Sequence, residues 1–342
     1  MRKKPLKPDV VLRSNPETVS WGWIAADRPP VARVKSGQTV RIDTVTHQGL
    51  NTGKDPVAFF RAAGIAPGEV LEDASEIYRS MKRGEGAGPH IITGPVYVEG
   101  ARPGDMLEVR VLDVAIRVPY GVNSTGPGWG AVPDLLEEPA QKIIKLDPRR
   151  RVALFSKGVE VPLAPFMGIV AVAPPPELKR VSTKPPGAFG GNLDFKHLTA
   201  GATLYLPVFN EGALFYTGDG HACQGDGEVD GTAIEISLTP TMQLFVHKGA
   251  GKSMNWPCAE DAANYYSMGM GPTLDGALKQ TIRETVEFLK GRGLSAAEAY
   301  ALASLAVDFR IGEAVNSVLM VYGVTPKRLF RRKPGYWAAR KG

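Results

Sequence analysis

Apolar and polar residues alternate with a period of two along much of this chain. The alternation, or a cluster of β-forming residues, covers residues 40–45, 107–112, 202–207, 233–238 and 242–246. Alternation sends every second side chain to the same face, which is typical of strands with one buried face. The chain also contains 39 glycines and 28 prolines, which favour tight turns between short strands. The pattern predicts a β-rich body.

Helical periodicity is found only near the C-terminus. Apolar residues lie at helical spacing at Leu278, Ile282, Val286 and Leu289. Ser295 and Glu298 form a capping box for a second helix, which we expect to end near Val307, and Asp275 is placed to cap the first. The predicted fold class is therefore β-rich α+β, with two sandwich-like β-sheet sub-domains and a C-terminal helical hairpin.

A proline-rich stretch at residues 174–187 suggests where the two sub-domains meet. We expect an N-terminal β-rich sub-domain at 1–180 and a C-terminal sub-domain at 181–342 that carries the helical hairpin. The alternative is one intertwined domain built from both halves.

The charge of the chain is concentrated at its ends. The net charge is +6, but residues 1–8 hold four basic groups and 325–342 hold seven, with no acid in either, so the remainder carries about −5. A body of that sign argues against nucleic-acid binding. No apolar run reaches the roughly 18 residues that a membrane span needs, and no apolar stretch follows the basic start, so we expect a cytoplasmic protein. Two cysteines make a disulfide framework improbable.

Polar side chains gather between glycines in residues 218–228, read as GDGHACQGDGE. In an extended backbone Asp219 and His221 project to one face, as do Asp226 and Glu228. A nitrogen and oxygen donor set suits zinc or another first-row divalent ion, whereas carboxylates with an amide alone suit calcium. The alternative is a turn between strands, where aspartate and glycine are common because they suit the backbone conformation of turns.

Other candidate residues lie outside this motif. Asp194 follows a second glycine-rich run and is a candidate ligand from a separate segment. His47 and His247 are expected to make ordinary hydrogen bonds, and the sequence leaves His90 and His197 undecided. A cysteine nucleophile, Cys223 or Cys258, is the alternative to a metal-activated water.

Residues 218–235 closely resemble the central motif of the acetamidase/formamidase family, and further segments match in the expected order. They are Trp21-Gly22, Pro29-Pro30-Val31, 93–101, Pro103-Gly104-Asp105, 190–194, 204–208 and Asp308-Phe309-Arg310-Ile311. The resemblance covers nearly the whole chain. It implies a hydrolase acting on C–N bonds other than peptide bonds, which cleaves a short-chain linear amide such as formamide or acetamide to a carboxylate and ammonia. It also implies a small-molecule substrate and a homo-oligomer.

Amide hydrolysis needs a strong nucleophile, an oxyanion stabiliser and a proton donor for ammonia. On the positions that the resemblance supports, we expect Asp194, Asp219 and His221 to hold a divalent metal, zinc first and calcium as the alternative. The remaining expected site residues are Glu228 for proton transfer, Gln224, Gly225 and Gly227 for positioning the substrate, Phe166 for lining its pocket, and Lys196 and Glu99 as further catalytic candidates. A cyclic amide substrate and a non-catalytic ligand-binding or metal-binding protein are the alternatives.

Overall fold

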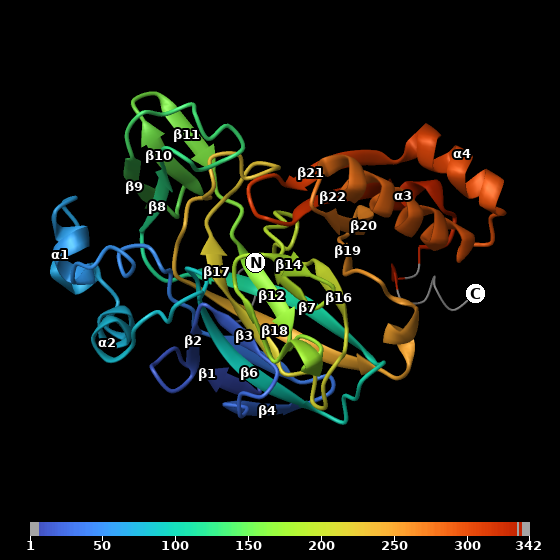
Figure 1. Cartoon of the computed structure of the whole chain (residues 1–342), viewed down its shortest axis with the longest axis horizontal. Coiled ribbons are helices and arrows are strands. Elements are labelled where there is room, and N and C mark those ends of the chain that lie inside the picture. Colours follow the sequence, from blue (N-terminus) through green and yellow to red (C-terminus); the bar gives the residue numbers. More distant parts are fainter. Residues whose placement is uncertain (1–6, 334, 337–342) are drawn as a thin grey trace.

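The computed structural model describes residues 7–333, 335 and 336, and its regular structure is mostly β-sheet (Figure 1). The strands of the nine-stranded sheet are, in spatial order, β1 (Val10–Leu12), β5 (Thr39–Ile42), β18 (Leu238–His247), β7 (Met106–Ile116), β16 (Thr203–Pro207), β19 (Cys258–Glu260), β20 (Asn264–Gly271), β22 (Leu319–Pro326) and β21 (Asp308–Glu313). Those of the seven-stranded sheet are β14 (Pro186–Gly187), β15 (Gly190–Asn192), β12 (Phe166–Val172), β17 (Phe215–His221), β6 (Ile91–Glu99) and β2 (Val19–Trp21), with β4 (Ala32–Lys35) also paired to β6.

Smaller elements complete the fold. A four-stranded sheet contains β11 (Val159–Pro162), β10 (Val152–Ser156), β9 (Ala140–Asp147) and β8 (Tyr120–Thr125), and β13 (Arg180–Ser182) pairs with β3 (Trp23–Ala25). The helices are α1 (Pro56–Arg61), α2 (Glu72–Ser80), α3 (Leu274–Lys290) and α4 (Ala296–Ala306), and the short 3₁₀ turns are η1 (Pro67–Glu69), η2 (Pro176–Leu178), η3 (Ala250–Ser253) and η4 (Lys327–Leu329). Within the described residues, no helix is both long and apolar enough to span a bilayer.

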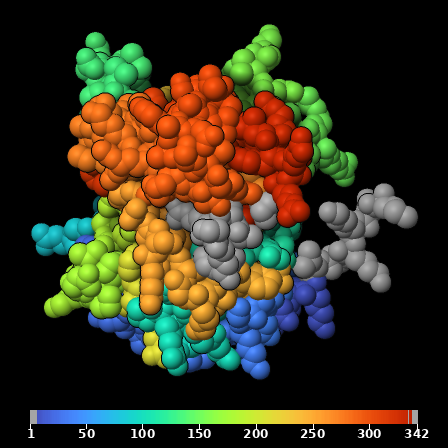
Figure 2. Space-filling view, turned by 90° about the vertical axis from the view of Figure 1, so that its right-hand side faces the viewer, coloured from blue at the N-terminus to red at the C-terminus, as the bar shows by residue number. Residues whose placement is uncertain are grey.

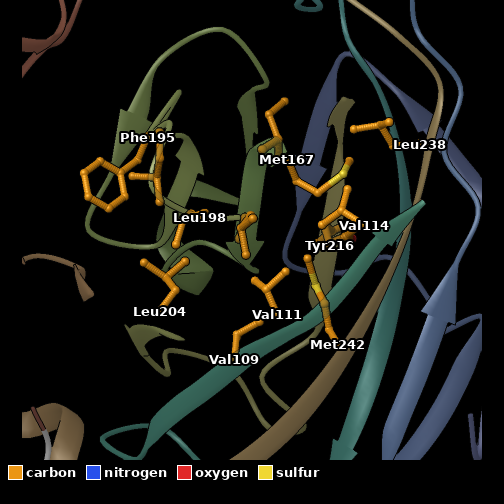
Figure 3. Close-up of a cluster of buried hydrophobic side chains, with 14 of the residues drawn as sticks. Val109, Val111, Val114, Met167, Phe195, Leu198, Leu204, Tyr216, Leu238 and Met242 are labelled. Atoms are coloured by element: carbon orange, nitrogen blue, oxygen red, sulfur yellow. The ribbon is translucent and has the colours of Figure 1, made fainter. Parts of the chain in front are cut away.

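The main hydrophobic core lies between the two large sheets. Val109 and Val111 of β7 and Met242 of β18 gather in one cluster with Met167 of β12 and Tyr216 of β17 (Figure 3). Strand β12 also contacts β16 and β18 of the other sheet. This arrangement confirms the predicted β-rich, sandwich-like class.

Most of the predicted strands form, but residues 233–238 do not make one. Strands β5, β7, β16 and β18 cover the other four runs. In the 233–238 run, Glu235 makes isolated bridges to Val122 and to His221, and β18 starts only at Leu238. Residues 233–238 are therefore buried between the segments of Val122 and His221, but they do not form a continuous series of strand hydrogen bonds with either.

The boundary expected at residue 180 does not separate two sheets. Strand β12 lies before it and β15 after it, yet the two pair antiparallel with Ile169 opposite Asn192. Both large sheets also draw strands from both halves of the chain. The proline-rich stretch 174–187 therefore does not divide the two large sheets, since β12 before it and β15 after it are hydrogen-bonded in the same sheet.

The C-terminal helical hairpin forms as predicted, with one difference at its start. Ser295 and Glu298 make the capping box of α4, but Thr273, and not Asp275, caps α3 by accepting from the Gly276 amide. Asp275 lies in the first turn of α3 and pairs with Lys279. Helix α3 packs against β20 and β22, and in the space-filling view the orange and red segment that contains α3 and α4 covers the upper part of the molecule (Figure 2).

The sequence analysis missed α1 and α2. Figure 1 places them on the opposite side of the sheets from α3 and α4. They are short, at 6 and 9 residues, which is below the length at which periodicity separates a helix from a loop. Their apolar residues cover the sheets beside the candidate site described below.

Candidate metal centre

Strand β17 supplies the centre of the candidate site. Asp219 and His221 lie two residues apart on it, and Oδ2 of Asp219 is 3.3 Å from Nε2 of His221, so the predicted shared face is confirmed. Glycines flank them because neighbouring backbone presses on the strand: a methyl group at Gly218 would lie 2.6 Å from the carbonyl oxygen of Ile91. Both Asp219 and His221 are buried.

Three groups of buried side chains around β17 have the composition and spacing of metal ligands. They are His47, His90 and Asp219; Asp219, His221 and Glu235; and Asp194, His221 and Glu228. Within each group the donor atoms lie within 4.8 Å of one another. The expected ligands Asp194 and Asp219 thus each share a group with His221, but not the same group.

His47 and His90 are the main residues that the sequence analysis did not assign to the site. His47 follows β5, His90 precedes β6, and their rings meet edge to face at 5.0 Å between centroids. Nδ1 of His47 lies 3.8 Å from Oδ1 of Asp219, and Nε2 of His90 lies 3.7 Å from Oδ2. No spacing pattern links the three, because separate segments bring them together.

The hydrogen bond on the far side of His90 fixes which nitrogen faces the carboxylate. Nδ1 lies 3.1 Å from the carbonyl oxygen of Thr183, which can only accept, so Nδ1 donates. Burial lowers the pKa of His90 and lowers that of His47 to about 3, so both rings are neutral at neutral pH. Nε2 of His90 therefore directs a lone pair at the Asp219 carboxylate. Two acceptors that face each other repel unless a cation lies between them. A histidine that binds a metal through one ring nitrogen usually donates from the other to a carbonyl or carboxylate oxygen, as His90 donates to Thr183.

A group rich in carboxylates continues the site on the other side of His221. Asp194, Glu228 and Glu313 are all buried, and Nδ2 of Asn192 donates to Oδ2 of Asp194 at 2.7 Å. Burial, followed by repulsion from Glu228 and Glu313, raises the pKa of Asp194 well above its usual range, and burial also raises the pKa values of Glu228 and Glu313. Burial and mutual repulsion thus oppose ionisation of these carboxyl groups, and a bound cation would favour their charged forms.

Three of the seven non-glycine residues with a positive φ in the described part of the chain are carboxylates of this site. Asp194, Asp219 and Glu228 have φ angles of 44°, 56° and 46°, in the left-handed region that side chains other than glycine seldom adopt. Such strain costs on the order of 1–3 kcal/mol per residue and is commonly found at functional sites. Three strained carboxylates around one histidine favour a site over a simple turn.

Glu235 and Glu313 are further residues that the sequence analysis missed. Oε1 of Glu235 lies 3.3 Å from Nε2 of His221, and burial raises the pKa of Glu235 to about 7. Burial opposes the charged form of His221, but Glu235 and Asp219 outweigh it and raise the pKa of His221 well above its usual value. Glu235 lies within the quoted 218–235 motif, whereas no sequence signal marked Glu313, which follows the quoted Asp308–Ile311 segment.

Several expected site residues lie elsewhere or act differently. Nε2 of Gln224 donates to the carbonyl oxygen of Asp194 at 2.8 Å, which ties the motif to the second segment. The Gly227 amide donates to the carbonyl oxygen of Gly312, so it is engaged within the protein, and Gly225 is exposed. Phe166 is fully buried, and its ring meets that of His221 edge to face. It therefore packs against His221 and does not line an open pocket.

Two of the expected catalytic residues lie outside the three groups. Lys196 pairs with Asp226 at 3.0 Å, and Asp226 also accepts from the Tyr322 hydroxyl at 2.6 Å. Asp226 therefore does not share a face with Glu228 as predicted, because the chain turns between them instead of continuing as a strand. Glu99 is exposed at the far end of β6 from His90.

The two cysteines lack the features of a nucleophile. Both are buried, and burial raises the pKa of the Cys223 thiol to about 11 despite the opposing effect of His221. The reactive form of cysteine is the thiolate, which such an environment disfavours.

The fold and this centre define a β-sandwich protein with a buried mixed nitrogen and oxygen donor set. The chain belongs to the Acetamidase/Formamidase family, whose model matches residues 72–184 and 179–331. It is 27% identical over 219 residues to the acetamidase of Mycolicibacterium smegmatis, covering 47% of this chain and 54% of that protein. It is 24% identical over 259 residues to the formamidase of Methylophilus methylotrophus, covering 59% of this chain and 58% of that one. The chain thus spans little more than half the length of these relatives.

A solved structure matches over a greater share of both chains. The acetamidase of Bacillus halodurans is 29% identical, with a TM-score of 0.77, and the match covers 94% of this chain and 99% of that one. The similarity therefore extends to the whole sandwich and not only to the central motif.

Proposed function

We propose that this chain hydrolyses short-chain linear amides, such as formamide or acetamide, with the help of a bound divalent metal ion. Membership of the family and similarity to an acetamidase and a formamidase support the substrate class. The observation that carries the metal is the lone pair on Nε2 of buried His90, which faces the Asp219 carboxylate at 3.7 Å, with buried His47 at 3.8 Å from the same carboxylate.

The donor set supports zinc as the first candidate. Two imidazoles and one carboxylate, here His47, His90 and Asp219, are a common catalytic zinc set that leaves a position for water or substrate. His221 and Glu235 extend the set around Asp219, so the originally expected ligands Asp219 and His221 stay in the proposal. The oxygen-rich group around Asp194 and Glu228 has a composition that suits calcium, which remains the alternative ion.

When bound, such an ion lowers the pKa of a coordinated water and polarises a carbonyl group. The protein's own groups supply the rest. The Thr183 carbonyl orients His90, and burial keeps bulk water away from Asp219 and His221. Glu228, whose Oε1 lies 4.0 Å from Nε2 of His221, is the proposed proton carrier that serves the departing ammonia.

The test is ammonia release from formamide and acetamide by purified protein, with bound metal quantified in the same samples. His47→Ala and His90→Ala are expected to lose both the metal and the turnover. His247→Asn, a histidine on β18 that contacts Glu108 and lies outside the three groups, is the matched control and should keep both. Melting temperatures check that each variant is folded.

The outcomes separate the alternatives. Turnover that survives complete metal removal would rule out the metal-dependent mechanism and favour a cysteine nucleophile. A tightly bound ion without turnover of any amide would support a metal-binding protein. Assaying 2-pyrrolidinone alongside tests the cyclic-amide alternative. Zinc, self-association and a cytoplasmic location stay predictions of the sequence.

A further inference from the structure

A small cavity lies against the candidate metal centre, beneath the segment that contains α1 and α2. Its volume is about 10 Å³. It is lined by Thr46, Gln48, Leu50, Phe60, Val70, Leu71, Ala74, Val118, Tyr120, Gly121, Val122, Glu235 and Ser237.

One wall of this cavity is shared with the centre. Glu235 lines the cavity and has Oε1 at 3.3 Å from Nε2 of His221. Gln48 lines it as well, and its Nε2 lies 3.2 Å from Nε2 of His47. Oε2 of Glu235 is buried and has no hydrogen-bond partner among the described residues. The Glu235 side chain therefore lies between the cavity and His221, so a molecule in the cavity would be next to the candidate metal ligands.

Most of the other lining residues are apolar, and they include Phe60 of α1, Leu71 at the start of α2 and Ala74 within α2. Tyr120 of β8 also lines the cavity, and its ring contacts that of Phe60, with the ring centroids 4.9 Å apart. Phe60, Ala74 and Tyr120 are each at most 5% exposed. A polar wall at the metal and apolar walls away from it match a small molecule with one polar and one alkyl end.

We infer that this cavity receives the acyl end of the substrate, and that Leu71 and Ala74 limit its length. The inference rests on the proposed function, because the acyl end in question is that of the amide substrate. A cavity of this volume holds about one water-sized probe, so it accepts a hydrogen or a methyl group and excludes longer chains. Formamide and acetamide fit this limit, whereas butyramide needs displacement of an apolar wall.

Two substitutions change the cavity in opposite directions. Leu71→Ala removes part of one wall, and Ala74→Val fills the space with two methyl groups. One methylene of misfit in an apolar pocket changes kcat/KM by about 10–200-fold. We expect Leu71→Ala to raise the ratio of butyramide to acetamide turnover at least tenfold, and Ala74→Val to lower the ratio of acetamide to formamide turnover by a similar factor.

Ala58→Val is the matched control. Ala58 lies on α1 in the same segment, but it is exposed and does not line the cavity. It should leave both ratios unchanged. Equal changes in kcat/KM for all amides in Leu71→Ala and Ala74→Val, with the control unaffected, would overturn the inference, because a general disturbance of the site does not discriminate by chain length.

A binding measurement separates failure of this inference from failure of the proposed function. Titration of the metal-loaded full chain with formate, acetate, propionate and butyrate should show binding that weakens beyond acetate, and Leu71→Ala should move that limit to longer chains. If wild type cleaves no amide but the limit still moves, the proposed function is wrong and the cavity assignment survives. If the limit does not move, the cavity assignment fails whatever the turnover.

Discussion

Gly168 of β12 has no side chain where one would enter the middle of the candidate site. A methyl group there would lie 2.6 Å from Oδ1 of Asp194, 2.7 Å from Oδ2 of Asp219 and 2.8 Å from Cε1 of His221. Ordinary contacts of such a carbon begin at 3.4 Å, so Gly168→Ala forces the two carboxylates to retreat by about 0.8 and 0.7 Å. The backbone at Gly168 does not have a positive φ, so alanine changes the site by volume and not by backbone strain.

The size of the effect follows from these displacements. Overpacking of a well-packed interior costs about 1–3 kcal/mol of stability, which lowers the melting temperature of a chain of this size by several degrees. A displacement of catalytic groups by about 1 Å costs on the order of 100-fold in rate. Gly168→Ala should therefore remain folded, while its amide turnover falls by about 100-fold and its bound metal decreases.

The assay compares Gly168→Ala with Gly84→Ala by ammonia release, metal content and thermal melting. A methyl at Gly84 meets nothing nearer than Nε1 of Trp23 at 3.9 Å, so this control should resemble wild type in all three. If Gly168→Ala keeps the metal content and turnover of the control, the three side chains do not form the reacting centre and the reasoning is refuted.

Three other predictions test individual contacts. Cys223→Ala should keep turnover, and iodoacetamide at neutral pH should not inactivate wild type, because the buried thiol has a pKa of about 11; inactivation that Cys223→Ala abolishes would contradict this. Burial raises the pKa of Asp105, but its hydrogen bonds from Lys248 and two amides outweigh this and hold the pKa below its usual value. The stability from this carboxylate is therefore complete above its unfolded pKa of about 3.9 and is lost as the pH falls through its folded pKa, so the melting difference between wild type and Asp105→Asn should shrink below about pH 4. Ser295→Ala removes the capping bonds with Glu298 and should cost about 1 kcal/mol in denaturant unfolding, and an unchanged midpoint would argue against the cap.

The sequence determined those features that depend on near neighbours. The period of two predicted β5, β7, β16 and β18, the spacing of apolar residues predicted α3, and the Ser295 capping box placed the start of α4. The same locality put Asp219 and His221 on one face of β17, since side chains two positions apart along a strand project to the same side.

Only the tertiary structure decided which distant segments complete the site. His47 and His90 reach Asp219 from separate connections to β5 and β6, and Glu235 reaches His221 through an isolated bridge. A lone histidine or glutamate carries no periodicity, so its neighbours depend on strand order. The pairing of β12 with β15 across the expected boundary shows the same limit. Local patterns report which residues are buried, whereas long-range strand pairing selects what they are buried against.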